Sequence, residues 1–342
     1  MKFPPLSCLK ARCFGLVILL GFGSCHSVIQ TVEGRKKAWE IKGGLTHEHV
    51  VTNFIGAKEI KESPAEENAI AISSIQPSLS ALKTLGINTL FECTPRYIGR
   101  DVLLLKALSE KTGMHIVTNT GWYAAVEKRY LPVEAFSWNE NQIAANWENE
   151  FLVGIENTGI KPGFIKLGVG DGRLDTVEAK LLRAAILVSH KTGMSIAVHT
   201  GDGAAAKHEL EIALQARLNP HKLIWVHAQN GTDKERKELA EKGIWISLDG
   251  ISEKNVNDYI ERILFFKKTG LLSRLLISHD DGWRVVKNGS YAQMELFGNG
   301  NPAPYETISK RLIPGLMMRG FEKGDIRQLM IRNPRMAFRL KK

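Results

Sequence analysis

Residues 111–120 read KTGMHIVTNT and residues 191–200 read KTGMSIAVHT, so one unit occurs twice in the chain. A shorter copy, KTGL, stands at residues 268–271. In each copy the glycine suits the left-handed turn that ends a helix, and the lysine suits its last turn. A β-strand pattern follows within a few residues. Helix, glycine cap and strand in this order are the repeating unit of a (β/α)8 barrel.

Short β-rich runs alternate with helical patterns from about residue 41 to the C-terminus, which predicts a parallel sheet with helical crossovers. We place eight strands at residues 42–49, 87–93, 115–119, 163–168, 195–200, 223–228, 244–248 and 274–280. This count predicts an α/β fold of the (β/α)8 TIM-barrel type. A doubly wound open sheet is the alternative, but it gives no reason for ligands at strand ends in both halves of the chain.

The length of 342 residues and the hydrophobic content of 44% allow either one large barrel or two ordinary domains. No glycine-rich linker or low-complexity stretch divides the chain after residue 40, so we assign residues 41–342 to a single barrel domain. Residues 25–40 read as a tether, within which residues 30–40 could instead form a first hairpin strand. Residues 324–340 predict a closing helix that is broken at Asn333 and Pro334.

Residues 1–24 have the composition of a cleaved export signal. A basic start precedes the apolar run FGLVILL at residues 14–20, which is too short for a permanent membrane helix. Cys25 then follows small residues, as at the site where bacterial lipoproteins are cleaved and acylated, although Phe22 stands where leucine is usual. We expect an exported protein, periplasmic or held at the outer membrane by a lipid on Cys25, and otherwise secreted by ordinary cleavage.

Cysteine use and charge exclude several classes of protein. Only Cys93 of the four cysteines lies beyond the signal region, which excludes a disulfide framework and a thiolate metal site. The formal net charge is +10, but no basic run is interleaved with aromatic residues, so we expect no nucleic-acid partner. We expect a small-molecule substrate as the partner. The sequence allows a homodimer as well as a monomer.

Metal-binding side chains end several of the predicted strands. His47 and His49 share one face of a strand because residues two apart point the same way. His199 and His227 end two successive strands, at the edge where barrel active sites lie. One strand histidine by itself is more often a packed core residue. Several histidines at equivalent strand ends together predict a metal site. Imidazole suits zinc, and manganese, cobalt and iron are also compatible.

Lys166 interrupts an otherwise apolar strand at residues 164–168. A buried ammonium is costly, so the alternative is a lysine that reaches the rim or pairs with an acid of the next loop. Beside the histidines, a desolvated neutral amine can capture carbon dioxide, and the carbamate can bridge two cations. The last strand ends in Asp280 and Asp281, and alternation alone does not decide which of them faces the site.

Six motifs follow in order from about Gly44 to Asn333: GLTHEH at 44–49, CTP with GRD at 93–101, TGWY at 120–123, IKL at 165–167, VHTG at 198–201 and ISHD at 277–280. In these motifs the chain resembles the phosphotriesterase-like branch of the amidohydrolase superfamily. The resemblance implies a binuclear site, with one buried ion, one exposed ion and a carbamylated lysine between them. The implied ligands are His47, His49 and Asp280 for the buried ion, His199 and His227 for the exposed ion, and Lys166 for the bridge.

The implied chemistry is hydrolysis. Two cations lower the pKa of a shared water, and by this resemblance Asp280 shuttles the proton from the bridging hydroxide. We expect a metal-dependent hydrolase of a carboxylic ester, lactone or amide. Phosphotriester hydrolysis is the alternative, although Gln229 and Asn230 stand where phosphotriesterases proper have an acidic pair. A non-catalytic barrel that keeps the metals for binding is the alternative from another class, but it would not need Lys166 and a carboxylate at the water.

Rim loops are expected to contact the substrate. The candidates on earlier loops form an aromatic wall with one cation: Arg96, Tyr97, Trp122 and Tyr123. Residues 282–305 form a long loop after the last strand that carries Trp283, and we expect this loop to cap the pocket. A surface excursion without a binding role is the alternative.

Overall fold

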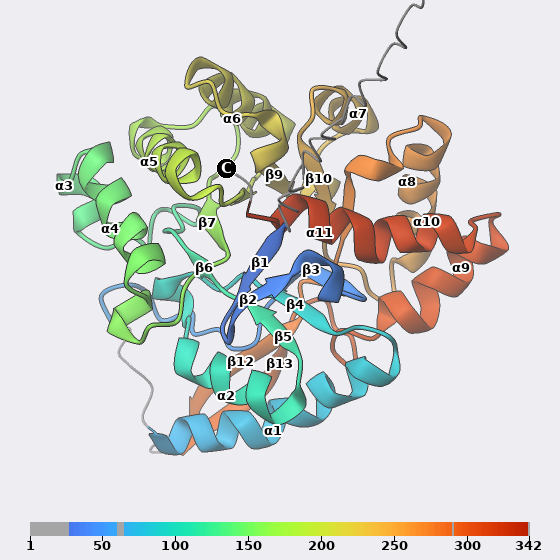
Figure 1. Cartoon of the computed structure of the whole chain (residues 1–342), viewed down its shortest axis with the longest axis horizontal. Helices are drawn as coiled ribbons and strands as arrows, with labels where there is room; N and C mark the ends of the chain where they lie inside the picture. The colour runs from blue at the N-terminus through green and yellow to red at the C-terminus, as the bar shows by residue number, and fades with distance from the viewer. Residues whose placement is uncertain (1–26, 60–64, 289–290, 341–342) are drawn as a thin grey trace, which may run out of the picture.

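The computed structural model describes residues 27–59, 65–288 and 291–340, so the predicted signal segment and Cys25 lie outside the described residues. Strands and helices alternate through most of this part (Figure 1). The central strands are β3 (Gly44–Glu48), β4 (Thr89–Glu92), β5 (His115–Val117), β6 (Asn119–Thr120), β7 (Phe164–Gly168), β8 (Ile196–His199), β9 (Leu223–Val226), β10 (Trp245–Leu248) and β11 (Leu275–Ile277). None of the described helices is both long and apolar enough to cross a bilayer.

The central strands form two parallel sheets, in the orders β3-β4-β5 and β6-β7-β8-β9-β10-β11. Only Thr118 separates β5 from β6, and its carbonyl accepts the N–H of Gly163 at 2.8 Å. At the other end, the Asp280 N–H donates to the His47 carbonyl at 3.2 Å, which brings the end of β11 beside β3. The parallel α/β fold predicted from the sequence is confirmed, and the arrangement is consistent with a (β/α)8 barrel.

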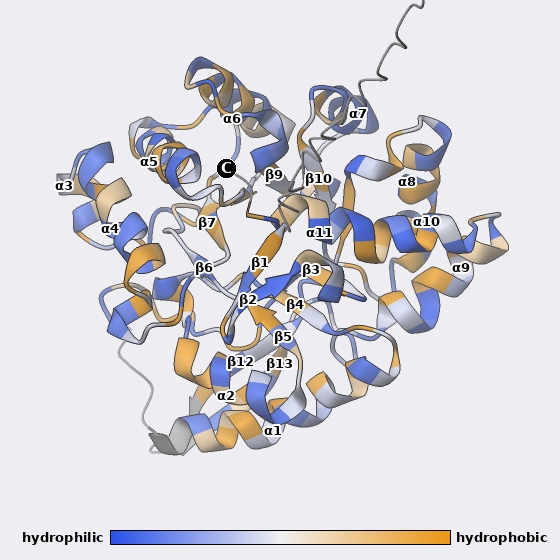
Figure 2. Cartoon of the chain, viewed as in Figure 1, coloured by the Kyte–Doolittle hydropathy of each residue, from blue (hydrophilic) through white to orange (hydrophobic). Residues whose placement is uncertain are grey.

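Helices cover the outside of the sheets (Figure 1). They are α1 (Ala65–Thr84), α2 (Val102–Thr112), α3 (Glu134–Ser137), α4 (Glu140–Leu152), α5 (Thr176–Thr192), α6 (Gly203–Gln215), α7 (Asp233–Glu241) and α8 (Val256–Lys268). Hydrophobic and hydrophilic residues are mixed along them, as expected of helices with one face on a sheet (Figure 2). The repeated KTG unit ends α2 at Gly113 and α5 at Gly193, with φ of 66° and 75°.

The segment before β3 forms a hairpin. β1 (Val28–Thr31) pairs with β2 (Gly34–Lys37) in antiparallel register, and Ile29 is fully buried. The Leu340 N–H donates to the Val28 carbonyl at 2.8 Å, so the hairpin also contacts the C-terminal segment. Of the two alternatives that the sequence left open for these residues, the structure has the hairpin.

The C-terminal helix continues through Pro334, so its predicted break is wrong. The π-helical segment η8 (Gln328–Arg332) connects α10 (Lys323–Arg327) to α11 (Asn333–Phe338). Proline cannot donate a helical hydrogen bond and crowds the preceding turn, and the wider π turn accommodates this loss. Pro314 in α9 (Ile313–Met318) follows η7 (Ile308–Leu312) in the same way.

The predicted long loop after the last strand contains a second hairpin. β12 (Gly282–Asn288) pairs with β13 (Tyr291–Phe297) in antiparallel register. The Thr52 N–H donates to the Trp283 carbonyl at 2.7 Å, which fixes the hairpin against the segment that follows β3. The hairpin therefore lies at the same end of the sheets as His49.

Candidate metal centre

A carboxylate lies between two imidazoles at the C-terminal end of β3. Asp280 Oδ1 is 3.2 Å from His47 Nε2 and 3.0 Å from His49 Nε2. The ligand atoms of His47, His227 and Asp280 all lie within 4.8 Å of one another. Side chains from three separate strand ends thus converge, as expected from the sequence.

Left-handed backbone conformations orient two of these side chains towards the candidate metal centre. Asp280 and His227 both have φ of 60°, the left-handed region, which costs a non-glycine residue about 1–2 kcal/mol. β11 ends at Ile277, so strand alternation no longer applies at Asp280. Asp281 instead accepts the N–H groups of Asn301 at 2.8 Å and Tyr305 at 3.1 Å. The structure thus places Asp280 at the histidines and Asp281 away from them.

Glu48 anchors the segment that carries Asp280. Its Oε1 accepts the Ser278 hydroxyl at 2.7 Å and His279 Nδ1–H at 2.7 Å, and its Oε2 accepts the Asp281 N–H at 3.0 Å. His279 Nε2 accepts the Ile308 N–H at 3.0 Å, so the proton of this imidazole belongs on Nδ1. This fully buried network holds the turn around Asp280 in one geometry.

The four candidate histidines form a row of imidazoles. Ring centroids are separated by 5.3 Å for His49 and His47, 4.9 Å for His47 and His227, and 4.4 Å for His227 and His199. Burial lowers the pKa of His47 and of His227 to about 4 and lowers the pKa of His199 well below its usual value. Neutral imidazole is the form that binds a metal ion.

Lys166 on β7 is 2% exposed, and burial lowers the pKa of its ammonium group. Its Nζ lies 5.8 Å from the ring of Tyr123, which is 5.0 Å from the ring of His199. Gly121 has φ of 113°, and a Cβ there would come within 2.3 Å of the Lys166 carbonyl oxygen. Glycine at this position of the TGWY motif therefore lets the chain pass close to β7 and brings Tyr123 to the site.

Asp249 is a residue of the site that sequence reasoning missed. It follows β10, and its Oδ2 accepts the His227 N–H at 3.0 Å. The same oxygen lies 4.0 Å from His47 Nδ1 and 3.8 Å from His227 Nδ1. Gln229 accepts the Asp249 N–H at 3.1 Å, and its Nε2 is 3.4 Å from His227 Nδ1. The available signal was its position, because Asp249 ends a strand just as His199 and His227 do.

The donor set suits divalent cations. His47 Nδ1 is buried and has no hydrogen-bond partner among the described residues, as expected of a ring placed for a ligand. Neutral imidazoles and a carboxylate are the nitrogen and oxygen donors that zinc and related ions prefer. The residues present therefore fit the metal site that the sequence predicted.

A row of aromatic rings, here called the aromatic row, extends from the histidines across three loops. Ring centroids are 5.7 Å apart for His49 and Phe297, 5.1 Å for Phe297 and Phe54, 6.3 Å for Phe54 and Tyr130, and 6.0 Å for Tyr130 and Tyr123. Tyr123 was predicted at the rim, whereas Phe54 and Tyr130 were not selected. Nothing in the local sequence distinguishes these two from other aromatic loop residues.

Two predicted rim tryptophans lie elsewhere. Trp122 is 3% exposed and packs edge-on against Trp147 at 5.4 Å, inside the hydrophobic core. In the β12–β13 pair Gly282 is opposite Phe297, and Trp283 is opposite Leu296. Neighbouring residues of a strand point to opposite faces, so Phe297 faces His49 and Trp283 faces the core.

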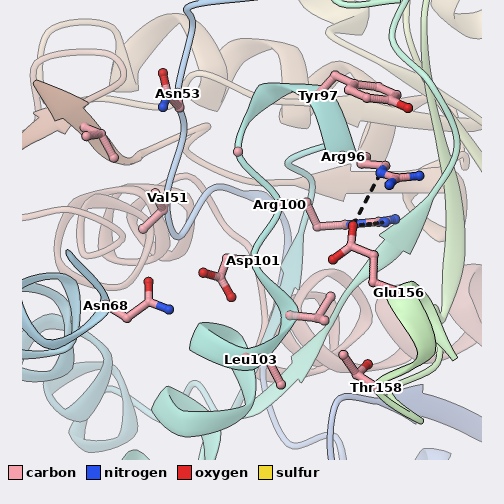
Figure 3. Close-up of a pocket in the computed structure, with 13 residues that line it drawn as sticks. Val51, Asn53, Asn68, Arg96, Tyr97, Arg100, Asp101, Leu103, Glu156 and Thr158 are labelled. Carbon is pink, nitrogen blue, oxygen red and sulfur yellow. Dashed lines mark ion pairs between the residues drawn. The ribbon is translucent and has the colours of Figure 1, made fainter. Parts of the chain in front are cut away.

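Arg96 and Tyr97 line a separate cavity of about 430 Å³, together with Arg100, Asn68 and Glu156 (Figure 3). The candidate metal ligands are not among its lining residues. Glu156 Oε1 lies 3.4 Å from Arg96 Nε and 3.6 Å from Arg100 Nη2. The charge of Arg96 is thus compensated by Glu156, and the structure does not bring Arg96 or Tyr97 to the histidines.

Strand-end histidines, an aspartate and a buried lysine define the class: an α/β protein with a candidate metal-binding site at the carboxyl ends of parallel strands. Residues 27–338 match the sequence profile of the Phosphotriesterase family. The chain belongs to this family.

Relatives and solved structures agree with this assignment. The Escherichia coli phosphotriesterase homology protein is 24% identical over 86% of this chain and 97% of its own length. Human N-acetyltaurine hydrolase is 25% identical over 91% of this chain and 98% of its own length. The structure of an organophosphorus hydrolase from Deinococcus radiodurans is 26% identical, with a TM-score of 0.79 over 92% of this chain and 97% of that one. The named enzymes among these similar proteins are hydrolases.

Proposed function

We propose that the protein is an exported, metal-dependent hydrolase that cleaves a carboxylic amide, ester or lactone. The observation that carries this proposal is the Asp280 carboxylate, held by a left-handed turn within 3.2 Å of His47 and 3.0 Å of His49, beside the buried Lys166. A charged lysine with this burial is costly, yet it lies near His47, His199 and His227, whose pKa values its charge lowers. Family membership and hydrolase relatives support the same reaction class.

We further propose two divalent ions, zinc first and manganese, cobalt or iron as alternatives. His47, His49 and Asp280 would hold one ion, His199 and His227 the other, and a carbamate on Lys166 would bridge them. When bound, such ions supply a nucleophilic water at neutral pH and polarise the bond to be cleaved. This assignment uses every member of the imidazole row.

The chain's own side chains would orient these groups and handle the proton. Asp280 would receive the proton of the attacking water and pass it to the leaving group. Asp249 accepts the backbone N–H of His227, and its carboxylate would contribute negative charge beside the rings of two ligands, whose Nδ1 atoms lie 4.0 and 3.8 Å from its Oδ2. The aromatic row would exclude bulk water from one side of the reacting bond.

The surroundings of His227 favour a carboxyl-derived substrate over a phosphotriester. Gln229 accepts from the Asp249 N–H and lies beside His227, and it cannot relay a proton as an acid can. We keep amides among the candidate substrates, beside esters and lactones, because relatives that match over 98% of their own length include N-acetyltaurine hydrolases. Arg96 pairs with Glu156, so it gives no reason to expect a carboxylate on the substrate.

Steady-state kinetics on a substrate panel test the proposal. The panel contains lactones, aryl esters, N-acyl amino acids, N-acetyltaurine and phosphotriesters, all with metal-loaded enzyme. We expect a carboxyl-derived substrate to exceed every phosphotriester in kcat/KM by at least about tenfold, or roughly 1.4 kcal/mol. A phosphotriester in first place would favour the alternative reaction, and no turnover of any substrate would favour a binding protein.

Phe297 is expected to set the preference for apolar acyl groups. Its ring lies between those of His49 and Phe54 and contacts both. Phe297→Ala should therefore lower kcat/KM about tenfold for a long-chain acyl substrate, because the acyl chain loses apolar contact with the ring. The acetyl homologue should change little. Leu296→Ala is the matched control, because Leu296 is 42% exposed and lies on the other face of β13. Equal losses for long and short substrates would contradict this role.

A further inference from the structure

An exposed basic surface lies at the end of the sheets opposite the metal centre. We name it the hairpin face and define it by Arg35, Lys37, Trp39 and Lys42, all of which are exposed. Arg35 and Lys37 are two apart on β2 and share its outer side. The 3-10 turn η1 (Ala38–Glu40) follows, with Ala38 buried and Trp39 59% exposed. The large apolar side chain is thus exposed to solvent on the same segment as three exposed cations.

Strand direction places the hairpin face far from the histidines. Lys42 precedes β3 at its N-terminal end, whereas His47 and His49 lie at its C-terminal end. The guanidinium of Arg335 in α11 donates to the carbonyls of Trp39 at 2.7 Å and Ile41 at 2.9 Å. Figure 1 looks onto this end, with β1, β2 and α11 drawn in front. A flat object that covers the hairpin face therefore leaves the metal centre open.

The cations of the hairpin face are available to a partner. In the part of the chain that the structure describes, Arg35, Lys37 and Lys42 take part in no ion pair. The nearby acids are engaged, since Glu33 pairs with Lys36 at 3.4 Å and Glu40 accepts the Lys37 N–H at 2.6 Å. Lys37 Nζ lies 5.7 Å from the Trp39 ring. Exposed tryptophan with lysine and arginine is the composition of surfaces that lie at a membrane interface.

We propose that the hairpin face docks on an anionic lipid bilayer. We choose a lipid surface as the partner because only a short stretch of chain separates Cys25, the expected lipid attachment site, from the hairpin. β1 begins at Val28, three residues after Cys25, and three residues span at most about 11 Å. A lipid on Cys25, as expected from the sequence, would hold the hairpin face near the headgroups, where the screening length is about 8 Å. Basic side chains within that distance attract anionic lipids.

This proposal goes beyond the hydrolase proposal and does not depend on it. It assigns an orientation, with the hairpin face on the lipid and the metal centre towards the solvent. A substrate would then reach the metal centre from the aqueous side while the protein stays on the membrane surface. The orientation follows from the opposite ends of β3 on which Lys42 and His47 lie.

Vesicle binding of the full-length chain tests the proposal. We would compare vesicles of phosphatidylcholine alone with vesicles that also contain phosphatidylglycerol, using co-sedimentation. The test variant is Arg35→Glu with Lys37→Glu and Lys42→Glu. The matched control is Lys58→Glu with Lys234→Glu and Lys254→Glu, which makes the same change of charge on exposed residues of the loops that follow β3 and β10 and of the first turn of α7; like the test residues, these three take part in no ion pair within the described part of the chain. All proteins compared share residues 1–26 with their basic start, so the difference in the affinity ratio between the hairpin variant and the control isolates the hairpin face.

We expect the unmodified chain and the control to bind the anionic vesicles at least about tenfold more tightly than the neutral ones. The hairpin variant should lose this preference. Trp39→Ala should weaken binding to anionic vesicles while it keeps the salt dependence, which provides a second test if the triple variant unfolds. Equal affinity of the unmodified chain for both vesicles would overturn the proposal, as would equal losses in the hairpin variant and the control.

Discussion

Asp280→Asn is expected to lower kcat/KM by roughly a thousandfold, because proton transfer by a placed side chain contributes about 10²–10⁴ in rate. Asp280 Oδ1 lies within 3.2 Å of His47 and 3.0 Å of His49, where an amide can neither accept the proton nor match the charge. The measurement is steady-state kinetics on the best substrate of the panel, with metal content determined in the same samples. Metal content separates a lost proton acceptor from a lost ligand.

Asp281→Asn is the matched control for this variant. Asp281 is the sequence neighbour and accepts from Asn301 and Tyr305, away from the imidazole row. We expect it to change stability more than kcat/KM. Full activity in Asp280→Asn combined with inactivity in Asp281→Asn would show that the left-handed turn had been assigned the wrong function.

The assignment of Asp280 also shows what the sequence could predict. Glycine caps, basic last turns and strand patterns depend on local conformation, so the repeated KTG unit predicted the parallel α/β fold. The histidines and Lys166 were found because each ends or interrupts an apolar strand, and parallel strands bring such positions together. These are short-range patterns that a reader of the sequence can recognise.

Long-range pairing accounts for most of what the sequence left undecided. The choice between Asp280 and Asp281 depends on a left-handed turn held by Glu48, which is far away in the chain. Which side of the β12–β13 hairpin faces the histidines depends on its pairing register. The sequence therefore offered no reason to choose Phe297 over Trp283 as a residue of the site. Burial of Trp122 depends on its packing against Trp147. None of these contacts has a local sequence signal.

Arg96 illustrates the same limit for charge. Its place after β4 suggested a cation at the rim, but its partner Glu156 lies on η3 (Ile155–Asn157). Glu156 has φ of 52°, so the backbone conformation as well as the side chain brings its carboxylate to Arg96 and Arg100. A sequence pattern gives the position of a charge along a strand, but it does not give the counter-charge that compensates it.

Lys166→Ala is expected to reduce the metal content from about two ions per chain to one or fewer, and kcat/KM by at least about a hundredfold. Lys166 is 2% exposed on β7 and lies beside Tyr123 and the row of imidazoles, and no other lysine among the described residues is buried. Elemental analysis gives the metal content. Isotope-labelled carbon dioxide should give a carbamate signal in the unmodified chain and none in the variant.

Short carboxylates such as acetate or propionate should partly restore activity to Lys166→Ala, because each can supply two oxygens to the space that the side chain leaves. Lys166→Met is the matched control, since it keeps most of the volume and should fold as well without accepting rescue. The two variants together separate a missing bridge from a cavity in the core, because a cavity alone would damage only the alanine variant. Two ions retained by Lys166→Ala, with activity unaffected by added carboxylate, would show that the buried lysine serves packing and that the imidazole row binds its metals without a bridge.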